Sequence, residues 1–79
     1  MPSETVSPAG PVSGLAVDGQ GTVYFLAGGQ SLWRIAPADN QAHLVYSASS
    51  AFGTGDVAVD DEWVYWSEPD HGLLVRMAR

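Results

Sequence analysis

The chain has 79 residues, no cysteine and a formal net charge of −6 from nine acidic and three basic side chains. This size allows one small domain, and the lack of cysteine excludes disulfides and thiolate metal sites. The negative charge argues against nucleic acid or an anionic membrane as partner, and no apolar run is long enough for a transmembrane helix. A hydrophobic content of 46% with 15% charged residues is typical of a folded, soluble domain.

Residues 1–13 are rich in proline, serine and glycine, a composition that by itself indicates a linker. The first five residues have no basic or apolar region, so they do not form a signal peptide, and the localisation stays open. A shift of 42 residues places residues 3–7 on residues 45–49, where a strand is expected. We therefore predict a weak outer edge strand over 3–7 that ends at Pro8, a residue suited to strand edges.

A clearer β pattern begins at Gly14. Residues 15–17 predict a short strand, and Asp18-Gly19-Gln20-Gly21 predicts a tight turn because glycine adopts positive φ at little cost. Residues 22–26 form a near-continuous apolar run, typical of a strand buried on both faces. Further strands are expected at 32–35 and 43–46.

The second half starts with a connection of small residues, 47–55, in which Phe52 is the one large apolar side chain. Strands are predicted at 57–59, 63–67 and 73–77, with turns at 60–62 and 69–72. No segment has a helical period, and turn residues recur every eight to twelve positions. This spacing predicts an all-β fold.

The two halves share one pattern. Leu15-Ala16-Val17-Asp18 returns 42 residues later as Val57-Ala58-Val59-Asp60, and Arg34 returns at the same offset as Arg76. Repeats near this length are typical of propeller blades. Two such units exceed the chain by five turn residues, so we predict two four-stranded antiparallel units cut within one hairpin turn. We divide the single two-blade unit, 1–79, into an outer strand and linker (1–13), a first blade (14–49) and three inner strands of a second (50–79).

These motifs resemble blades of the YWTD and NHL classes of β-propeller. The family pattern runs Gly-Leu-Ala-Val-Asp, then Tyr-Trp-Thr-Asp, then an apolar-x-Arg strand, and this chain has two copies: Gly14 to Asp18, Tyr24 to Ala27 and Leu32 to Arg34, then Asp56 to Asp60, Tyr65 to Glu68 and Leu74 to Arg76. Here Glu68 replaces the family aspartate, Leu26-Ala27 the Thr-Asp pair, and Asp56 the leading glycine. The resemblance implies a propeller, usually of six blades in the YWTD class, which mostly binds proteins or peptides. Related classes include lactonases and lyases.

Two blades cannot close a ring, and each would leave apolar faces bare. A face of four strands covers on the order of 300 Å², near the largest patch that monomers expose. Head-to-tail association covers both faces. We therefore expect a homotrimer with six blades, or a tetramer with eight, in which residues 3–7 pair with residues 73–77 of a neighbour. A chain this short is plausible as a designed protein or a piece excised from a propeller.

Two functions follow from this architecture. The favoured one is a self-assembling scaffold that binds a ligand at the channel mouth, formed by loops 27–31, 50–55 and 68–72. The ligand-binding candidates there are Gln30, Glu68, Asp70 and His71. The alternative is a metal-dependent enzyme of the lactonase or lyase kind, with Asp18 and Asp60 repeated around the channel as ligands for Ca²⁺. The chain has two histidines, which favours the scaffold over the enzyme.

Each candidate also has a purely structural interpretation. Asp18 and Asp60 would accept backbone N–H bonds within their own turns. Arg34 and Arg76 would pair with carboxylates between blades instead of clamping a ligand. The acidic turn at 68–71 would be solvated instead of performing acid–base chemistry. In the strands, the aromatic side chains would form core between blades instead of a binding platform: Tyr24, Phe25, Trp63, Tyr65 and Trp66.

Two catalytic or cofactor motifs are not supported by the sequence. Residues 53–58 fit the spacing of a dinucleotide-binding glycine motif, but that motif needs a helix after it, and a short strand and an acidic turn follow instead. No Ser-His-Asp or Cys-His constellation is recognisable.

Overall fold

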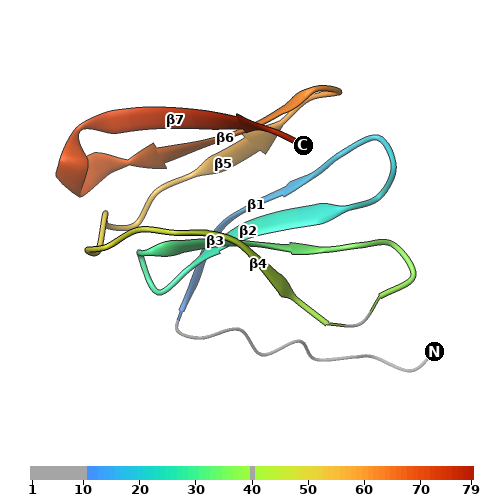
Figure 1. The fold of residues 1–79 in the computed structure, drawn as a ribbon, viewed down its shortest axis with the longest axis horizontal. Coiled ribbons are helices and arrows are strands. Elements are labelled where there is room, and N and C mark those ends of the chain that lie inside the picture. Colours follow the sequence, from blue (N-terminus) through green and yellow to red (C-terminus); the bar gives the residue numbers. More distant parts are fainter. Residues whose placement is uncertain (1–10, 40) are drawn as a thin grey trace.

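The computed structural model describes residues 11–39 and 41–79, so the strand predicted over 3–7 lies outside the described residues. The elements are β1 (Val12–Val17), β2 (Val23–Ala27), β3 (Ser31–Ile35), β4 (His43–Ser47), β5 (Val57–Val59), β6 (Trp63–Glu68), a single 3₁₀ turn η1 (Pro69–His71), and β7 (Leu73–Ala78) (Figure 1). The all-β prediction is confirmed, and each strand predicted within the described residues is present.

The seven strands form two antiparallel sheets in sequence order, β1-β2-β3-β4 and β5-β6-β7. The two sheets share a register. Tyr24 lies opposite Arg34 in the first sheet, and Tyr65 lies opposite Arg76 in the second. The two sequence motifs therefore occupy matching positions on their sheets.

Strand β1 begins at Val12, three residues before the predicted start at Leu15. The reason is Gly14, whose φ of 67° lies in the left-handed region that glycine adopts without strain. The register with β2 shifts at this glycine, between Ser13 and Leu15, so that the ladder continues through a β-bulge.

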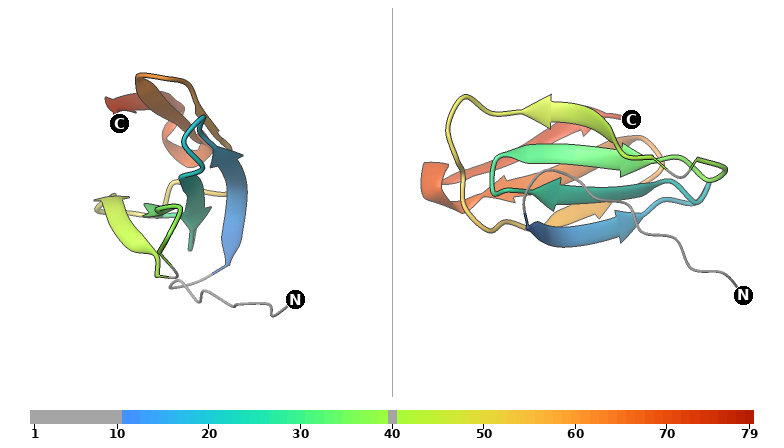
Figure 2. Two further views of the ribbon diagram at one scale, coloured as in Figure 1. Left: turned by 90° about the vertical axis from the view of Figure 1, so that its right-hand side faces the viewer. Right: turned by 90° about the horizontal axis from the view of Figure 1, so that it is seen from below.

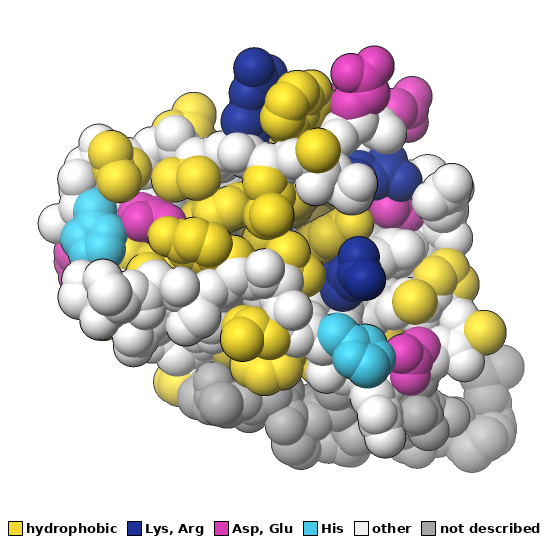
Figure 3. Space-filling view, viewed as in Figure 1, with side chains coloured by type: hydrophobic (Ala, Val, Ile, Leu, Met, Phe, Trp, Pro, Cys, Tyr) yellow, Lys and Arg dark blue, Asp and Glu magenta, His cyan; other side chains and the backbone are white. Residues whose placement is uncertain are grey.

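The two sheets face each other, as the end view in Figure 2 shows. They lie closest at their first strands, β1 and β5, and spread apart toward β4 and β7. Apolar side chains fill the wedge between them (Figure 3). The buried residues of this core are Tyr24, Leu26, Leu32, Phe52, Val64 and Trp66.

The aromatic side chains divide between the two faces of their sheets. Tyr24 and Trp66 are buried, and their burial in the core is as predicted. Trp63 and Tyr65 are only half-buried in the single chain. Successive side chains of a strand point to opposite faces, so these two lie on the face of β6 turned away from the first sheet.

Within the described residues, no helix is long and apolar enough to cross a membrane.

Candidate functional site

Three loops meet at one end of the molecule: the turn between β2 and β3, the connection 48–56, and η1 with the residues after it (Figure 1). Phe52 joins them, because its N–H donates to the Gly29 carbonyl oxygen at 2.6 Å and its own carbonyl accepts from the Asp70 N–H at 2.8 Å. Its ring is fully buried in the core between the sheets. The one large apolar residue of this connection therefore anchors both sheets to the loop.

The four predicted ligand-binding residues all lie at this end, on or beside the joined loops. The Gln30 side chain donates to the Ala48 carbonyl oxygen at 2.9 Å. The Asp70 carboxylate lies against Gly53, where a Cβ atom would come within 2.9 Å of its Cγ. Glu68 and His71 contact each other.

Glu68 and His71 belong to a chain of hydrogen bonds that starts in the core. The Trp66 Nε1–H donates to Glu68 Oε2 at 2.8 Å, and Glu68 Oε1 lies 3.0 Å from His71 Nδ1. His71 Nε2 lies 3.1 Å from the Ser50 hydroxyl oxygen. The carboxylate is 2% exposed, whereas the serine and histidine are open to solvent.

This arrangement corrects the interpretation of the turn as a solvated acidic cluster. Glu68 points inward because it shares the face of β6 that carries the buried Val64 and Trp66. The statement that no serine, histidine and acid constellation is recognisable is likewise wrong for the folded chain. Ser50 is 21 residues from His71, and nothing in its local sequence distinguishes it from Ser47 or Ser49.

The predicted metal ligands lie at the opposite end, in the turns after β1 and β5. Asp18 Oδ1 accepts from the N–H groups of Gln20 and Thr22 at 2.9 and 3.0 Å. Asp60 Oδ1 accepts from Glu62 and Trp63 at 2.8 and 2.7 Å. Turn capping, the structural alternative for both residues, is what the structure shows. Ca²⁺ binding by either carboxylate stays a prediction.

The second oxygen of each carboxylate also has a partner. Asp18 Oδ2 pairs with the Arg79 guanidinium at 3.0 Å, and Asp60 Oδ2 accepts from the Tyr65 hydroxyl at 2.6 Å. Arg79 also donates to the Asp60 carbonyl oxygen at 2.6 Å. One arginine therefore ties the first turn of one sheet to the first turn of the other.

These contacts shift the acidity of both carboxyl groups. For Asp18, burial is the largest single influence and favours the neutral acid. Hydrogen bonds from Thr22 and Gln20, together with the Arg79 charge, outweigh burial and lower the pKa of this carboxyl. The Tyr65 hydrogen bond is the largest influence on Asp60 and lowers its pKa, while the same bond raises the pKa of Tyr65.

Neither strand arginine pairs with a carboxylate among the described residues, contrary to the structural interpretation of Arg34 and Arg76. Arg76 instead stacks on the Trp63 ring, with its Cζ 4.1 Å from the ring centroid. The inter-sheet ion pair is made by Arg79.

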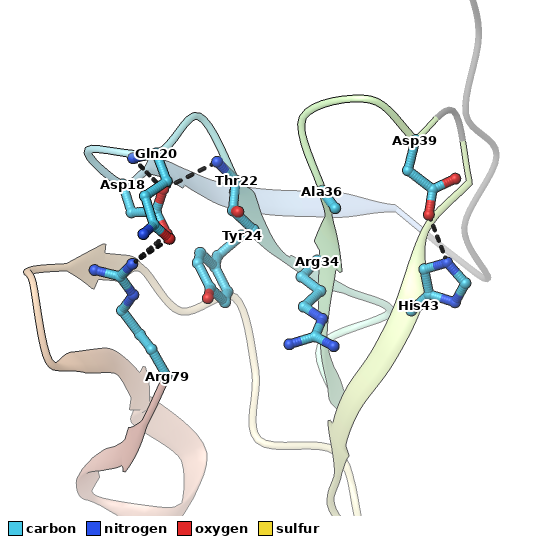
Figure 4. Close-up of a pocket in the computed structure, with 9 residues that line it drawn as sticks. All are labelled: Asp18, Gln20, Thr22, Tyr24, Arg34, Ala36, Asp39, His43 and Arg79. Atoms are coloured by element: carbon cyan, nitrogen blue, oxygen red, sulfur yellow. Dashed lines mark hydrogen bonds and ion pairs between the residues drawn. The ribbon is translucent and has the colours of Figure 1, made fainter.

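Arg34 lies in a pocket of about 520 Å³ beside the turn of Asp18. Figure 4 shows its guanidinium pointing into the space beside Tyr24, with Arg79 approaching from the end of β7 and His43 held by Asp39 on the other side. A smaller pocket of about 350 Å³ lies at the opposite end, next to the joined loops. Its lining is mostly small side chains: Pro11, Val12, Ser13, Gly28, Gly29, Ala51, Gly53 and Thr54.

Comparison with models of known protein families gives no match, and no curated protein matches the chain either.

Proposed function

We propose that this chain is a self-assembling β-propeller unit whose copies associate head to tail into a closed ring and bind a ligand at the loops of one end. The observation that supports this most is a correspondence between faces. The faces left open on the two sheets match, position by position, the two faces that already pack together within the chain.

The common register defines which residues correspond. Because Tyr24 faces Arg34 and Tyr65 faces Arg76, Tyr24 corresponds to Tyr65. One residue further along β6, Trp66 corresponds to Phe25. Trp66 is the side chain through which the second sheet packs on the first, and it lies 5.1 Å from the Tyr46 ring of β4, measured between ring centroids.

The outward face of the first sheet therefore carries the counterpart of a packing surface. Four of its apolar side chains are more than half exposed: Val12, Leu15, Val17 and Leu44, at 51%, 65%, 54% and 54%. At about 25 cal/mol per Å², covering a blade face contributes several kcal/mol, comparable to the whole stability of a small domain.

The opposite open face belongs to the second sheet. It carries Tyr65 and Leu74, which correspond to the core residues Tyr24 and Leu32, and Leu74 is 77% exposed. A neighbour's first sheet placed on this face would repeat the contact found inside one chain. Such a contact joins two different surfaces, so it continues from copy to copy until a ring closes.

The wedge between the sheets supplies the curvature that closure requires. The sheets converge at β1 and β5 and diverge toward β4 and β7, as blades do around a central axis (Figure 2). Three chains would supply six blades, and four chains, the alternative, eight. The loops that carry Gln30, Glu68, Asp70 and His71 would then recur around one rim of the ring.

The solution mass tests this proposal. Light scattering behind a sizing column should give three chain masses of 8.3 kDa, about 25 kDa in all. Leu15→Glu places a charge in the open face and should leave a monomer or an aggregate. Ala38→Glu adds the same charge in the exposed turn before β4 and should leave the trimer intact.

A folded wild-type monomer at micromolar concentration would contradict the proposal. Equal masses for the Leu15→Glu and Ala38→Glu variants would show that the open face of the first sheet is not the surface through which copies meet.

A further inference from the structure

We propose that Ser50, His71 and Glu68 form a nucleophile, base and acid set that hydrolyses small carboxylic esters through an acyl-serine intermediate. The three side chains come from one chain, so this activity does not rest on ring assembly.

The proposal begins with the order of contacts. In serine hydrolases a hydroxyl meets one histidine nitrogen, and a carboxylate holds the other nitrogen. Here the Ser50 hydroxyl oxygen lies 3.1 Å from His71 Nε2, and Glu68 lies 3.0 Å from His71 Nδ1. Both distances are within hydrogen-bonding reach of a general base and its orienting group.

The carboxylate selects the useful form of the histidine ring. An ionised carboxylate only accepts hydrogen bonds, so Nδ1 carries the proton that bonds to Glu68. Nε2 is then left with a lone pair directed at Ser50. Glu68 is itself held by the Trp66 indole N–H at 2.8 Å and is 2% exposed, so its position is set by the core and not by solvent.

The surroundings of Ser50 suit attack on a small substrate. The serine is exposed. Its own N–H and that of Ala51 donate to no acceptor within the described residues, which leaves two backbone donors for a developing oxyanion. Ala51 also lines the pocket of about 350 Å³ that includes Gly28, Gly29 and Gly53. Short acyl groups fit such a lining better than branched or aromatic ones.

The reaction balances without any redox partner. The Ser50 oxygen bonds to the ester carbonyl carbon while its proton passes to His71 Nε2. The bond from that carbon to the leaving oxygen then breaks, and Nε2 returns the proton to the departing alcohol. Water next attacks the acyl carbon and gives a proton to Nε2. The carboxylic acid leaves as Ser50 regains its hydrogen. Ser50 and His71 are the catalytic residues here, and Glu68 is a positioning residue.

The test uses the full chain, p-nitrophenyl acetate as substrate and a fluorophosphonate as covalent probe. We expect an initial release of p-nitrophenolate of up to one equivalent per chain, and one probe molecule located at Ser50 by fragmentation mass spectrometry. Ser50→Ala should abolish labelling and lower the rate about 100-fold, the scale of positioned acid–base catalysis. Ser49→Ala removes the neighbouring hydroxyl and should change neither readout.

The positioning role has its own readout. Glu68→Gln, which keeps a hydrogen-bond acceptor for Trp66, should lower kcat with little change in KM, because the amide can donate to Nδ1 and reverse the tautomer. Since Glu68 is buried and its replacement can destabilise the fold, His71→Gln on the exposed turn is the second variant and should also abolish labelling.

Absence of labelling in a folded wild-type protein would overturn the inference, and so would equal hydrolysis by the wild type and Ser50→Ala. A trimer that does not react with the probe would sink the hydrolase while leaving the proposed assembly intact.

Discussion

Asp60 organises the turn after β5 through both of its carboxylate oxygens. Backbone N–H groups of Glu62 and Trp63 donate to Oδ1, and the Tyr65 hydroxyl donates to Oδ2. These donors favour the ionised form and hold the pKa of Asp60 below its ordinary value. One residue therefore links a local turn to a strand of the second sheet.

This lowered pKa predicts an acid-dependent loss of stability. A carboxyl group whose pKa is lower in the folded than in the unfolded state stabilises the fold above its unfolded pKa, about 3.9. That contribution disappears as the pH falls through the folded pKa. We therefore expect the melting temperature to fall between about pH 4 and pH 2, and Asp60→Asn to reduce this fall.

Asp61→Asn is the matched control, because Asp61 is exposed in the same turn. It should leave the pH dependence of the melting temperature unchanged. If Asp60→Asn and the wild type lost stability in parallel below pH 4, the carboxylate bonds would not be the cause.

At the scale of elements, the connection 48–56 is fitted to β6 at Gly55. This glycine is buried, and a Cβ atom there would overlap the Ser67 carbonyl oxygen. Ser67 also donates its N–H to the Asp56 carbonyl at 3.0 Å and accepts the Asp56 N–H on its hydroxyl at 2.9 Å. The loop therefore follows the strand too closely for any side chain at position 55.

We predict that Gly55→Ala lowers the free energy of unfolding by about 1–3 kcal/mol, the range for overpacking. Gly19→Ala is the control, because a Cβ atom at Gly19 would meet nothing within 4 Å. It should change stability by less than about 0.5 kcal/mol, as surface substitutions do. Urea denaturation of both variants measures the difference. Equal stability of the two would place the loop away from β6.

Strand β6 gives a second test, because its two faces have different partners. Trp66→Ala should cost about 3–5 kcal/mol at any protein concentration, since this ring is buried within the chain. Tyr65 is half-buried, so Tyr65→Ala, like Trp63→Ala, should reach that cost only where a neighbouring copy covers the face. We expect loss of assembly to accompany it.

Chemical denaturation at two protein concentrations distinguishes these contributions. If Tyr65→Ala costs under about 1 kcal/mol at high concentration, the outward face of β6 stays exposed to solvent and the ring model fails.

At the scale of the whole molecule, β7 ends the second sheet with one open edge, since its one strand partner in the described chain is β6. The sequence predicts that residues 3–7 of a neighbouring copy pair with this edge. Each added backbone hydrogen bond would contribute about 0.5–1.5 kcal/mol, and an uncovered edge invites aggregation.

We therefore predict that deleting residues 1–8 weakens the ring and increases aggregation, as measured by light scattering. In the intact protein, hydrogen exchange at residues 4–6 should be slow. Fast exchange at these residues, in an assembly that survives the deletion, would identify the segment as a tail.

The sequence by itself determined the strands, because each depends on local chemistry. Alternating and continuous apolar residues located β2 and β6, and the Asp-Gly pair at 18–19 located the first turn. The start of β1 was missed because Gly14 permits a bulge that side-chain pattern alone does not reveal. Of the candidate site, the sequence located Glu68 and His71 on one turn, since they are three residues apart.

Only the tertiary structure decided which distant side chains meet. Ser50 reaches His71 because the connection 48–56 is drawn in by the buried Phe52. Arg79 reaches Gln20, 59 residues away, because the two sheets face each other with their first strands adjacent. Local propensity carries no information about such contacts. They follow from how two apolar faces pack, and that packing also turned Glu68 from a predicted surface charge into a buried one.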